Sequence, residues 1–200
     1  MAAPQPTLGL RDRNKLRLRG ELLEAVLDLF ADENPNALNV EAVAQKAGCS
    51  KATVYVYFPG GLNEMLCAIY ADISDEVYAE AMQLHGEASN VLERLKGLAK
   101  PVLDMSARPR RGKFFAHLDP QLSPALQPVM GRTSGRMEAT MARDLADVVG
   151  PDAAIMAVFL VGALREASVR IAKDPACKND MRDGFTKLVQ TLIASQKVTR

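Results

Sequence analysis

The chain of 200 residues is poor in the residue types that most often carry chemistry: it has no tryptophan, two histidines and three cysteines, and 5% of it is aromatic. Cys49, Cys67 and Cys177 are odd in number and far apart, which fits neither a disulfide framework nor the paired spacing of a zinc site. His85 and His117 stand in no spacing with cysteine or carboxylate that forms a ligand set or a catalytic triad. We therefore expect free thiols in a reducing cytoplasm, no metal, no cofactor and no enzymatic activity.

The chain as a whole also lacks an excess of one charge sign, because its formal net charge is +1. Overall basicity therefore gives no sign of nucleic-acid binding, and the distribution of charge has to supply it. Residues 1–20 carry five basic side chains against one acid, whereas residues 21–60 carry two against six. No apolar run is long enough for a membrane span, since Ala153–Leu164 is shorter than the ~20 residues required. We expect a cytoplasmic protein without a membrane partner.

Helical periodicity is the main pattern that the sequence does contain, in a chain that is 48% hydrophobic. Apolar residues recur at spacings of three and four near the amino end and again after the break at Pro59-Gly60-Gly61. The two stripes are Leu22, Ala25, Val26, Leu29, Phe30 and then Leu62, Leu66, Ile69, Ile73, Val77. Strand-like alternation is absent from the sequence, so we predict an all-α fold.

The most informative segment runs from Gly48 to Phe58. Gly48 follows an apolar helical stretch and can take the positive φ that ends a helix, and Ser50 is suited to cap the next helix. Val54 and Phe58 are four residues apart and are expected to point inward. The opposite face carries Lys51, Ala52, Thr53, Tyr55 and Tyr57. Such a face suits phosphates and base edges, which indicates a helix-turn-helix that binds DNA.

Together with Leu38–Ser50 before it and Tyr55–Pro59 at its end, this segment resembles the DNA-binding domain of the TetR family of bacterial transcriptional regulators. The resemblance covers about residues 13–70 and includes a long first helix, a short second one, a recognition helix ending in Tyr-x-Tyr-Phe and a long fourth helix. It implies a three-helix DNA-binding domain with its amino-terminal arm in residues 1–61. A larger helical domain for effector binding and dimerisation would occupy residues 62–200, joined through the long fourth helix.

The resemblance also implies which side chains contact DNA. The recognition-helix contacts would come from Ser50, Lys51, Ala52, Thr53, Tyr55 and Tyr57. Asn39 at the start of the second helix and the basic first helix, with Arg13, Arg17 and Arg19, would contact phosphates. The chain departs from the family pattern at Gly61, where a lysine commonly opens the fourth helix, so one phosphate anchor is missing.

Two interpretations stay open for several features of the second domain. The methionines are typical either of plain core or of a pocket for apolar ligands, because methionine is flexible and polarizable. His117 either lines that pocket or packs at the surface, and Arg108–Lys113 is predicted to be a solvated loop or a contact for an acidic effector or the DNA backbone. The candidate pocket residues are Met105, Phe115, His117, Met137, Met141 and Phe159.

The last two predicted helices carry more apolar surface than one chain is expected to bury, although an internal core is the alternative interpretation. The segment Ile155–Leu164 is apolar on every side, and the final helix has a wide apolar seam. In the resembling family the last two helices pair with their copies as a four-helix bundle. The candidate interface residues are Phe159, Gly162, Ala163, Phe185, Leu188 and Leu192.

These observations predict a homodimeric regulator that binds a palindromic operator in double-stranded DNA. The resemblance implies a repressor released by a small apolar or amphipathic effector, whose identity the sequence does not give. The alternative hypothesis keeps the DNA-binding domain but has the carboxyl-terminal domain recruit a protein partner rather than a small ligand.

Overall fold

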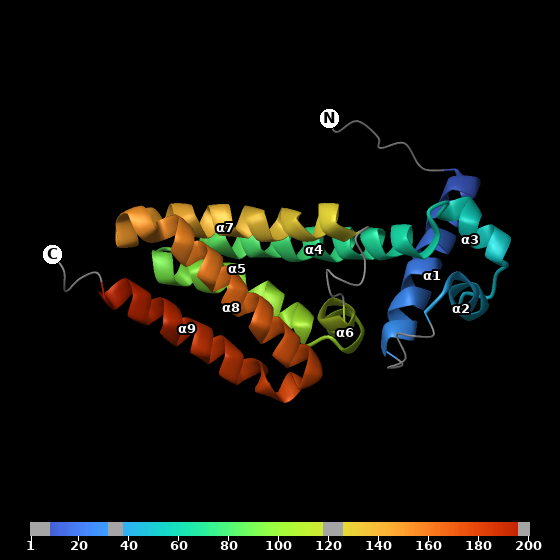
Figure 1. The fold of residues 1–200 in the computed structure, drawn as a ribbon. Coiled ribbons are helices and arrows are strands. Elements are labelled where there is room, and N and C mark those ends of the chain that lie inside the picture. Colours follow the sequence, from blue (N-terminus) through green and yellow to red (C-terminus); the bar gives the residue numbers. More distant parts are fainter. Residues whose placement is uncertain (1–8, 32–37, 118–125, 196–200) are drawn as a thin grey trace. The chain divides into compact units, whose positions relative to one another are not determined.

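A computed structural model describes residues 9–31, 38–117 and 126–195, and every regular element in these ranges is helical (Figure 1). The prediction of an all-α fold is therefore confirmed for the described residues. The α-helices are α1 (Leu10–Ala31), α2 (Val40–Lys46), α3 (Lys51–Tyr57), α4 (Gly61–Glu87), α5 (Val91–Ser106), α6 (Pro109–His117), α7 (Gln127–Val149), α8 (Ala153–Lys173) and α9 (Lys178–Ser195). Short 3-10 turns, η3 (Gly150–Asp152) and η4 (Pro175–Cys177), precede α8 and α9.

The chain forms two compact units, Met1–Ala68 and Ile69–Arg200, that divide inside α4. The sequence placed the boundary after residue 61, at the break before that helix. The first two turns of α4 belong to the amino-terminal unit because Met65 is fully buried and Leu66 nearly so. The amino-terminal unit is otherwise built from α1, α2 and α3, whose buried residues include Leu22, Val26 and Val43.

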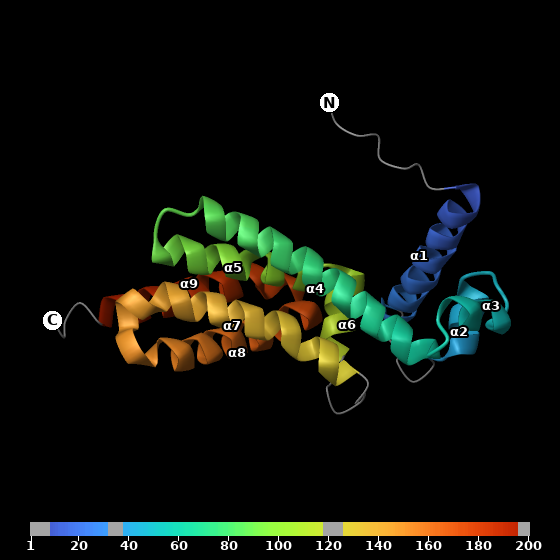
Figure 2. The same ribbon diagram turned by 90° about the horizontal axis from the view of Figure 1, so that it is seen from above.

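In the larger unit, α8 is the central helix and contacts α5, α6, α7 and α9. Helices α7 and α8 are in contact, and Figure 2 shows them next to each other. The core between these helices holds Leu98, Met141, Leu145, Leu160 and Ile171, each at most 2% exposed. This packing buries one face of α8, whereas Ile155, Val158 and Phe159 on the same helix stay exposed.

The basic segment after α5 is not the loop that the sequence predicted. Pro109 opens α6, where its missing N–H and fixed φ suit the first helical position. The guanidinium groups of Arg108 and Arg111 bind the carboxylate of Glu76 on α4 at 3.2 and 2.6 Å. Gly112 lets α6 approach α5, because a Cβ there would collide with the carbonyl oxygen of Ser106. These arginines are structural links between helices of the larger unit.

A second polar link joins three helices of the larger unit and was not anticipated from the sequence. His85 in the last turn of α4 lies 2.7 Å from Asp144 on α7 through Nε2 and Oδ2. Arg94 on α5 contacts the other carboxylate oxygen of Asp144 at 3.4 Å. Asp144 is only 7% exposed, and its charge is therefore balanced within the fold. His85 acts here in helix packing.

Candidate nucleic-acid interface

The turn between α2 and α3 is held by backbone hydrogen bonds that depend on Gly48. This glycine has a φ of +66°, in the left-handed region that ordinary residues adopt at a cost. Its N–H donates to the carbonyl of Gln45 at 3.2 Å, and the N–H of Cys49 donates to the carbonyl of Ala44 at 2.9 Å. These bonds satisfy the last carbonyls of α2 and turn the chain toward α3.

Side-chain caps fix where α2 and α3 begin. The side-chain oxygen of Asn39 accepts from the N–H of Ala42 at 2.9 Å, and Ser50 Oγ accepts from the N–H of Thr53 at 3.1 Å. Ser50 Oγ also lies 2.8 Å from the hydroxyl of Thr53. The predicted caps are confirmed, and each orients the amino end of a helix whose N–H groups favour a phosphate.

Helix α3 has one buried face and one exposed face, divided as the sequence predicts. Val54 and Phe58 are fully buried, while Val56 is 74% exposed and Tyr55 is 45% exposed. Lys51 and Ala52 are exposed as well, and Thr53 and Tyr57 are half-buried. The Lys51 ammonium lies 4.0 Å from the Glu41 carboxylate, a distant pair between exposed groups that leaves the cation accessible.

The arginines of the basic first helix α1 differ in their exposure and in the contacts that they make. Arg13 and Arg17 are exposed, and Arg17 makes a surface ion pair with Glu21 at 3.4 Å. Arg19 is half-buried, with its guanidinium 4.9 Å from the centre of the Phe58 ring. Arg19 therefore supports the end of the recognition helix through a cation–π contact, a role that sequence periodicity did not reveal.

The backbone conformation at position 61 requires glycine, which explains why this chain lacks the lysine that is common there. Gly61 has a φ of +63°, and its N–H donates to the carbonyl of Phe58 at 2.8 Å. A Cβ at Gly61 would stand 3.3 Å from Cε1 of Tyr55 and 3.6 Å from Val40. The glycine thus allows the chain to turn tightly behind Tyr55, which holds this tyrosine on the exposed face.

Residues 22–60 match the sequence model of bacterial regulatory proteins of the tetR family. Over 80 residues the chain is 32% identical to the transcriptional repressor KstR2 of Mycobacterium tuberculosis, a stretch that is 40% of this chain and 40% of that relative. The amino-terminal region of the chain is therefore similar to regulators of the TetR family. Both the family model and this relative are described as regulatory proteins.

The fold of the chain is similar to that of solved structures over most of its length. A transcriptional regulator from Rhodococcus sp. Rha1 matches with a TM-score of 0.76 and 18% identity, over 88% of this chain and 96% of its own. The protein RolR, solved in complex with resorcinol, matches with a TM-score of 0.59 and 17% identity, over 89% and 90% of the two chains. At these identities the likeness establishes the fold alone.

The larger unit contains a cavity of about 550 Å³ that is lined by residues of α4, α5, α6, α7 and α8. Met105, Phe115 and Met137 line it, as the pocket interpretation predicted. Met141 is fully buried but is not part of the lining, and Phe159 is 65% exposed and does not line it either. His117 ends α6, and its side chain lies outside the described part of the structure.

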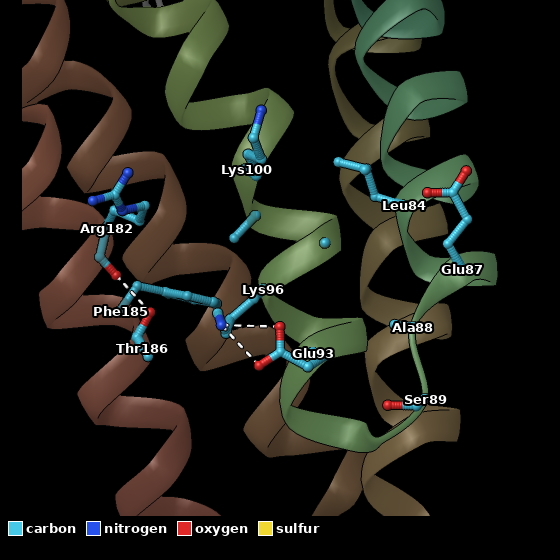
Figure 3. Close-up of a pocket in the computed structure, with 12 residues that line it drawn as sticks. Leu84, Glu87, Ala88, Ser89, Glu93, Lys96, Lys100, Arg182, Phe185 and Thr186 are labelled. Atoms are coloured by element: carbon cyan, nitrogen blue, oxygen red, sulfur yellow. Dashed lines mark hydrogen bonds and ion pairs between the residues drawn. The ribbon is translucent and has the colours of Figure 1, made fainter.

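A second, more open cavity of about 470 Å³ lies between the end of α4, the first half of α5 and α9 (Figure 3). Its basic residues already have partners within the chain. Lys96 binds Glu93 at 2.8 Å and Lys100 binds Asp104 at 2.8 Å, while Arg182 contacts Asp183 at 3.4 Å. Because these basic side chains are paired locally, this cavity offers an anionic ligand little unmatched positive charge.

The predicted interface residues of the TetR-like dimer divide between the surface and the core. Phe159 is exposed, Leu188 is 47% exposed, and Gly162 also lies at the surface. Ala163 and Leu192 are half-buried. The prediction that Phe185 lies in the dimer interface is wrong, because this side chain is only 6% exposed and packs in the core of its own chain.

Neither a metal nor an activated thiol is indicated by the described residues. No group of three or more histidine, cysteine, aspartate or glutamate side chains comes together in the described ranges. All three cysteines are free thiols, and burial raises the pKa of Cys49 and of Cys67 above the ordinary value. A raised pKa keeps a thiol protonated at neutral pH and disfavours redox chemistry there.

Proposed function

We propose that the chain is a transcriptional regulator of the TetR type that binds a palindromic operator as a homodimer and releases it when a small effector binds. Repression is supported by the similar protein KstR2, which is described as a transcriptional repressor. The proposal joins three features of the chain: the exposed face of α3, the uncovered apolar face of α8, and the cavity in the larger unit.

The observation that carries the DNA-binding part is the division of α3 into two faces. Val54 and Phe58 anchor the helix from behind, so the ammonium of Lys51 and the hydroxyl of Tyr55 are presented on a rigid support. An α-helix fits the major groove, where lysine and hydroxyl groups bind phosphates and base edges. Asn39 and the exposed arginines of α1 supply further phosphate contacts in this proposal.

The exposed apolar face of α8 supports the proposal of a homodimer. Ile155, Val158 and Phe159 are each more than half exposed in the single chain. The stretch Gly131–Lys173 even passes for a membrane span by length and composition, with only 28% of its most apolar window buried. That is weak support for a membrane, since core helices of soluble proteins pass the same test, and the stretch turns at η3 between α7 and α8. A second copy would cover this face and place two copies of α3 about 34–36 Å apart, in successive major grooves.

Effector control is proposed as a shift between two conformations of the dimer. A ligand that prefers the conformation unfit for DNA weakens operator binding by the ratio of its affinities for the two states. Helix α4 begins in the DNA-binding unit and continues into the unit that contains the cavity, so it is the element suited to couple them. A cavity of this size in the larger unit favours a small ligand over recruitment of a protein partner, which needs a surface rather than a cavity.

The DNA-binding proposal is tested by two substitutions on the exposed face of α3. Lys51→Ala and Tyr55→Phe are each expected to lower affinity for a duplex selected by the wild-type protein by about 5- to 30-fold, since each removes a hydrogen bond or charge contact worth roughly 1–2 kcal/mol. Fluorescence anisotropy measures the affinity, and a thermal melt checks folding. Tyr78→Phe removes a phenol oxygen from the other unit and serves as the matched control. Undiminished binding in both α3 variants contradicts the assignment.

A further inference from the structure

The chemistry of the cavity in the larger unit is that of an apolar chamber with a single charge. Its walls include the rings of Tyr70 and Phe115, whose centres are 4.8 Å apart, and the side chains of Val161 and Leu164. Among the described residues that line it, Arg165 alone is charged, and no carboxylate is present. A ligand with a negative group and an apolar body would match this distribution.

Arg165 has no hydrogen-bond or ion-pair partner within the described part of the chain, unlike several other arginines of the larger unit. Arg108 and Arg111 bind Glu76, Arg94 contacts Asp144, and Arg170 binds Glu166 at 2.8 Å. No hydrogen bond or ion pair between Arg165 and a described residue is present. Its guanidinium therefore keeps five N–H donors in a planar fork, the arrangement that binds a carboxylate through two parallel hydrogen bonds.

The position of Arg165 suits the charged end of such a ligand. Arg165 both lines the cavity and is exposed, so it lies where the cavity meets solvent. A carboxylate bound there stays partly hydrated, which reduces the desolvation cost that a deeply buried ion pair would carry. Burial raises the pKa of Tyr70 overall, and the hydrogen bond with Ser74 and the charge of Arg165 offset part of that rise, so the positive charge reaches inward.

Hydroxyl groups add donors to the same chamber. Thr133 and Ser134 on α7 line the cavity, and no side-chain hydrogen bond joins either hydroxyl to a described residue. Ser168 on α8 donates to the carbonyl of Leu164 at 2.8 Å, which leaves its oxygen free only to accept. One guanidinium with nearby hydroxyls matches a single negative charge, whereas a doubly charged phosphate monoester would leave one charge without a counterion.

We propose that the effector is an amphipathic monocarboxylic acid, with its carboxylate bound by Arg165 at the mouth of the cavity and its apolar body between the aromatic pair and the aliphatic side chains of α8. The regulatory role of this ligand rests on the proposed function, which the assignment makes more specific. The binding of the acid itself is a property of the larger unit and is tested without DNA.

The test compares acids with uncharged partners of the same shape. Isothermal titration calorimetry of the full chain uses the series from phenylacetate to 6-phenylhexanoate, and each acid is paired with its primary amide. At least one acid should bind ten-fold or more tightly than its amide. In Arg165→Gln this acid should lose ten-fold or more in affinity while the amide is unchanged, because only the acid uses the charge.

Arg170→Gln is the matched control, since Arg170 lies on the same helix, is bound to Glu166 and does not line the cavity. It should keep the preference for the acid. The proposal is overturned if no acid of the series binds, if acid and amide bind alike, or if Arg165→Gln keeps the preference.

Operator binding is measured on the same protein samples, so that the two proposals fail separately. Specific operator binding without a preference for acids overturns the assignment of the ligand and leaves the regulatory function standing. A preference for acids that depends on Arg165, in a protein that selects no operator, supports the site and contradicts the regulatory function.

Discussion

At the scale of single residues, the backbone of Gly61 is the clearest constraint on the DNA-binding unit. Its positive φ and the 3.3 Å approach of Tyr55 predict that Gly61→Ala lowers the free energy of unfolding by about 1–2 kcal/mol, the usual cost of the left-handed conformation for a residue with a Cβ. Urea unfolding followed by circular dichroism measures the change, which suits a chain without tryptophan.

Gly20→Ala provides the opposite sign as a control. Gly20 lies inside α1, and a Cβ there would meet nothing within 4 Å. Alanine should therefore raise the free energy of unfolding by roughly 0.5–1 kcal/mol. If the two alanine variants shift stability in the same direction, the backbone explanation for Gly61 is wrong.

The exposed face of the recognition helix could be predicted residue by residue, because it depends on local rules. Spacing placed Val54 and Phe58 inside, and hydroxyl chemistry placed the cap at Ser50. The contact of Arg19 with the Phe58 ring could not be predicted in the same way, since it joins residues that are far apart in sequence. The proposed role of Arg165 could not be predicted either, because it depends on which side chains lie near this arginine in space.

At the scale of helices, the contact between α6 and α4 gives a pH-dependent prediction. The hydrogen bond from Arg111 is the largest cause that holds the pKa of Glu76 below its ordinary value of 4.5, and Arg108 adds to it. A carboxylate with a lowered folded pKa stabilises the protein above the unfolded value, and this contribution is lost as the pH falls through the folded pKa.

Glu76→Gln should therefore be less stable than the wild type at neutral pH, by roughly 0.5 kcal/mol because the pair is about half exposed. The difference should shrink as the pH falls below 4.5 and vanish in more acidic solution. Urea midpoints across that range measure it, with Glu138→Gln as a control, since no ion pair joins Glu138 to a described residue. A difference that persists unchanged at acid pH contradicts the ionic origin.

The sequence predicted one wide apolar seam on the final helix but not which part of that seam faces the core of its own chain. In α9 one stripe holds Phe185 and Val189, and the neighbouring stripe holds Leu188 and Leu192. Both have helical spacing, so periodicity alone does not tell which one faces the chain's own core. Packing against α5 selects Phe185 and Val189 for the inside. A proline likewise marked a break after α5, although Pro109 in fact opens α6.

At the scale of the whole molecule, the exposed face of α8 predicts that function requires two copies. Phe159→Glu places a charge on the most exposed aromatic residue of that face, where burial against a second copy would leave it unpaired. The wild type should sediment as a dimer and the variant as a folded monomer with much weaker operator binding. Leu16→Glu changes a similarly exposed leucine on α1 and should leave the dimer intact. A dimer that survives Phe159→Glu contradicts the proposed interface.

The central claim is that two copies of α3 read one stretch of double-stranded DNA. Selection of binding sites by the purified protein from a pool of random duplexes tests it most directly. The account predicts a consensus that is an inverted repeat, with half-site centres about one helical turn apart or a small multiple of it. A pool that shows no enrichment, or a consensus with a single unrepeated half-site, would contradict it.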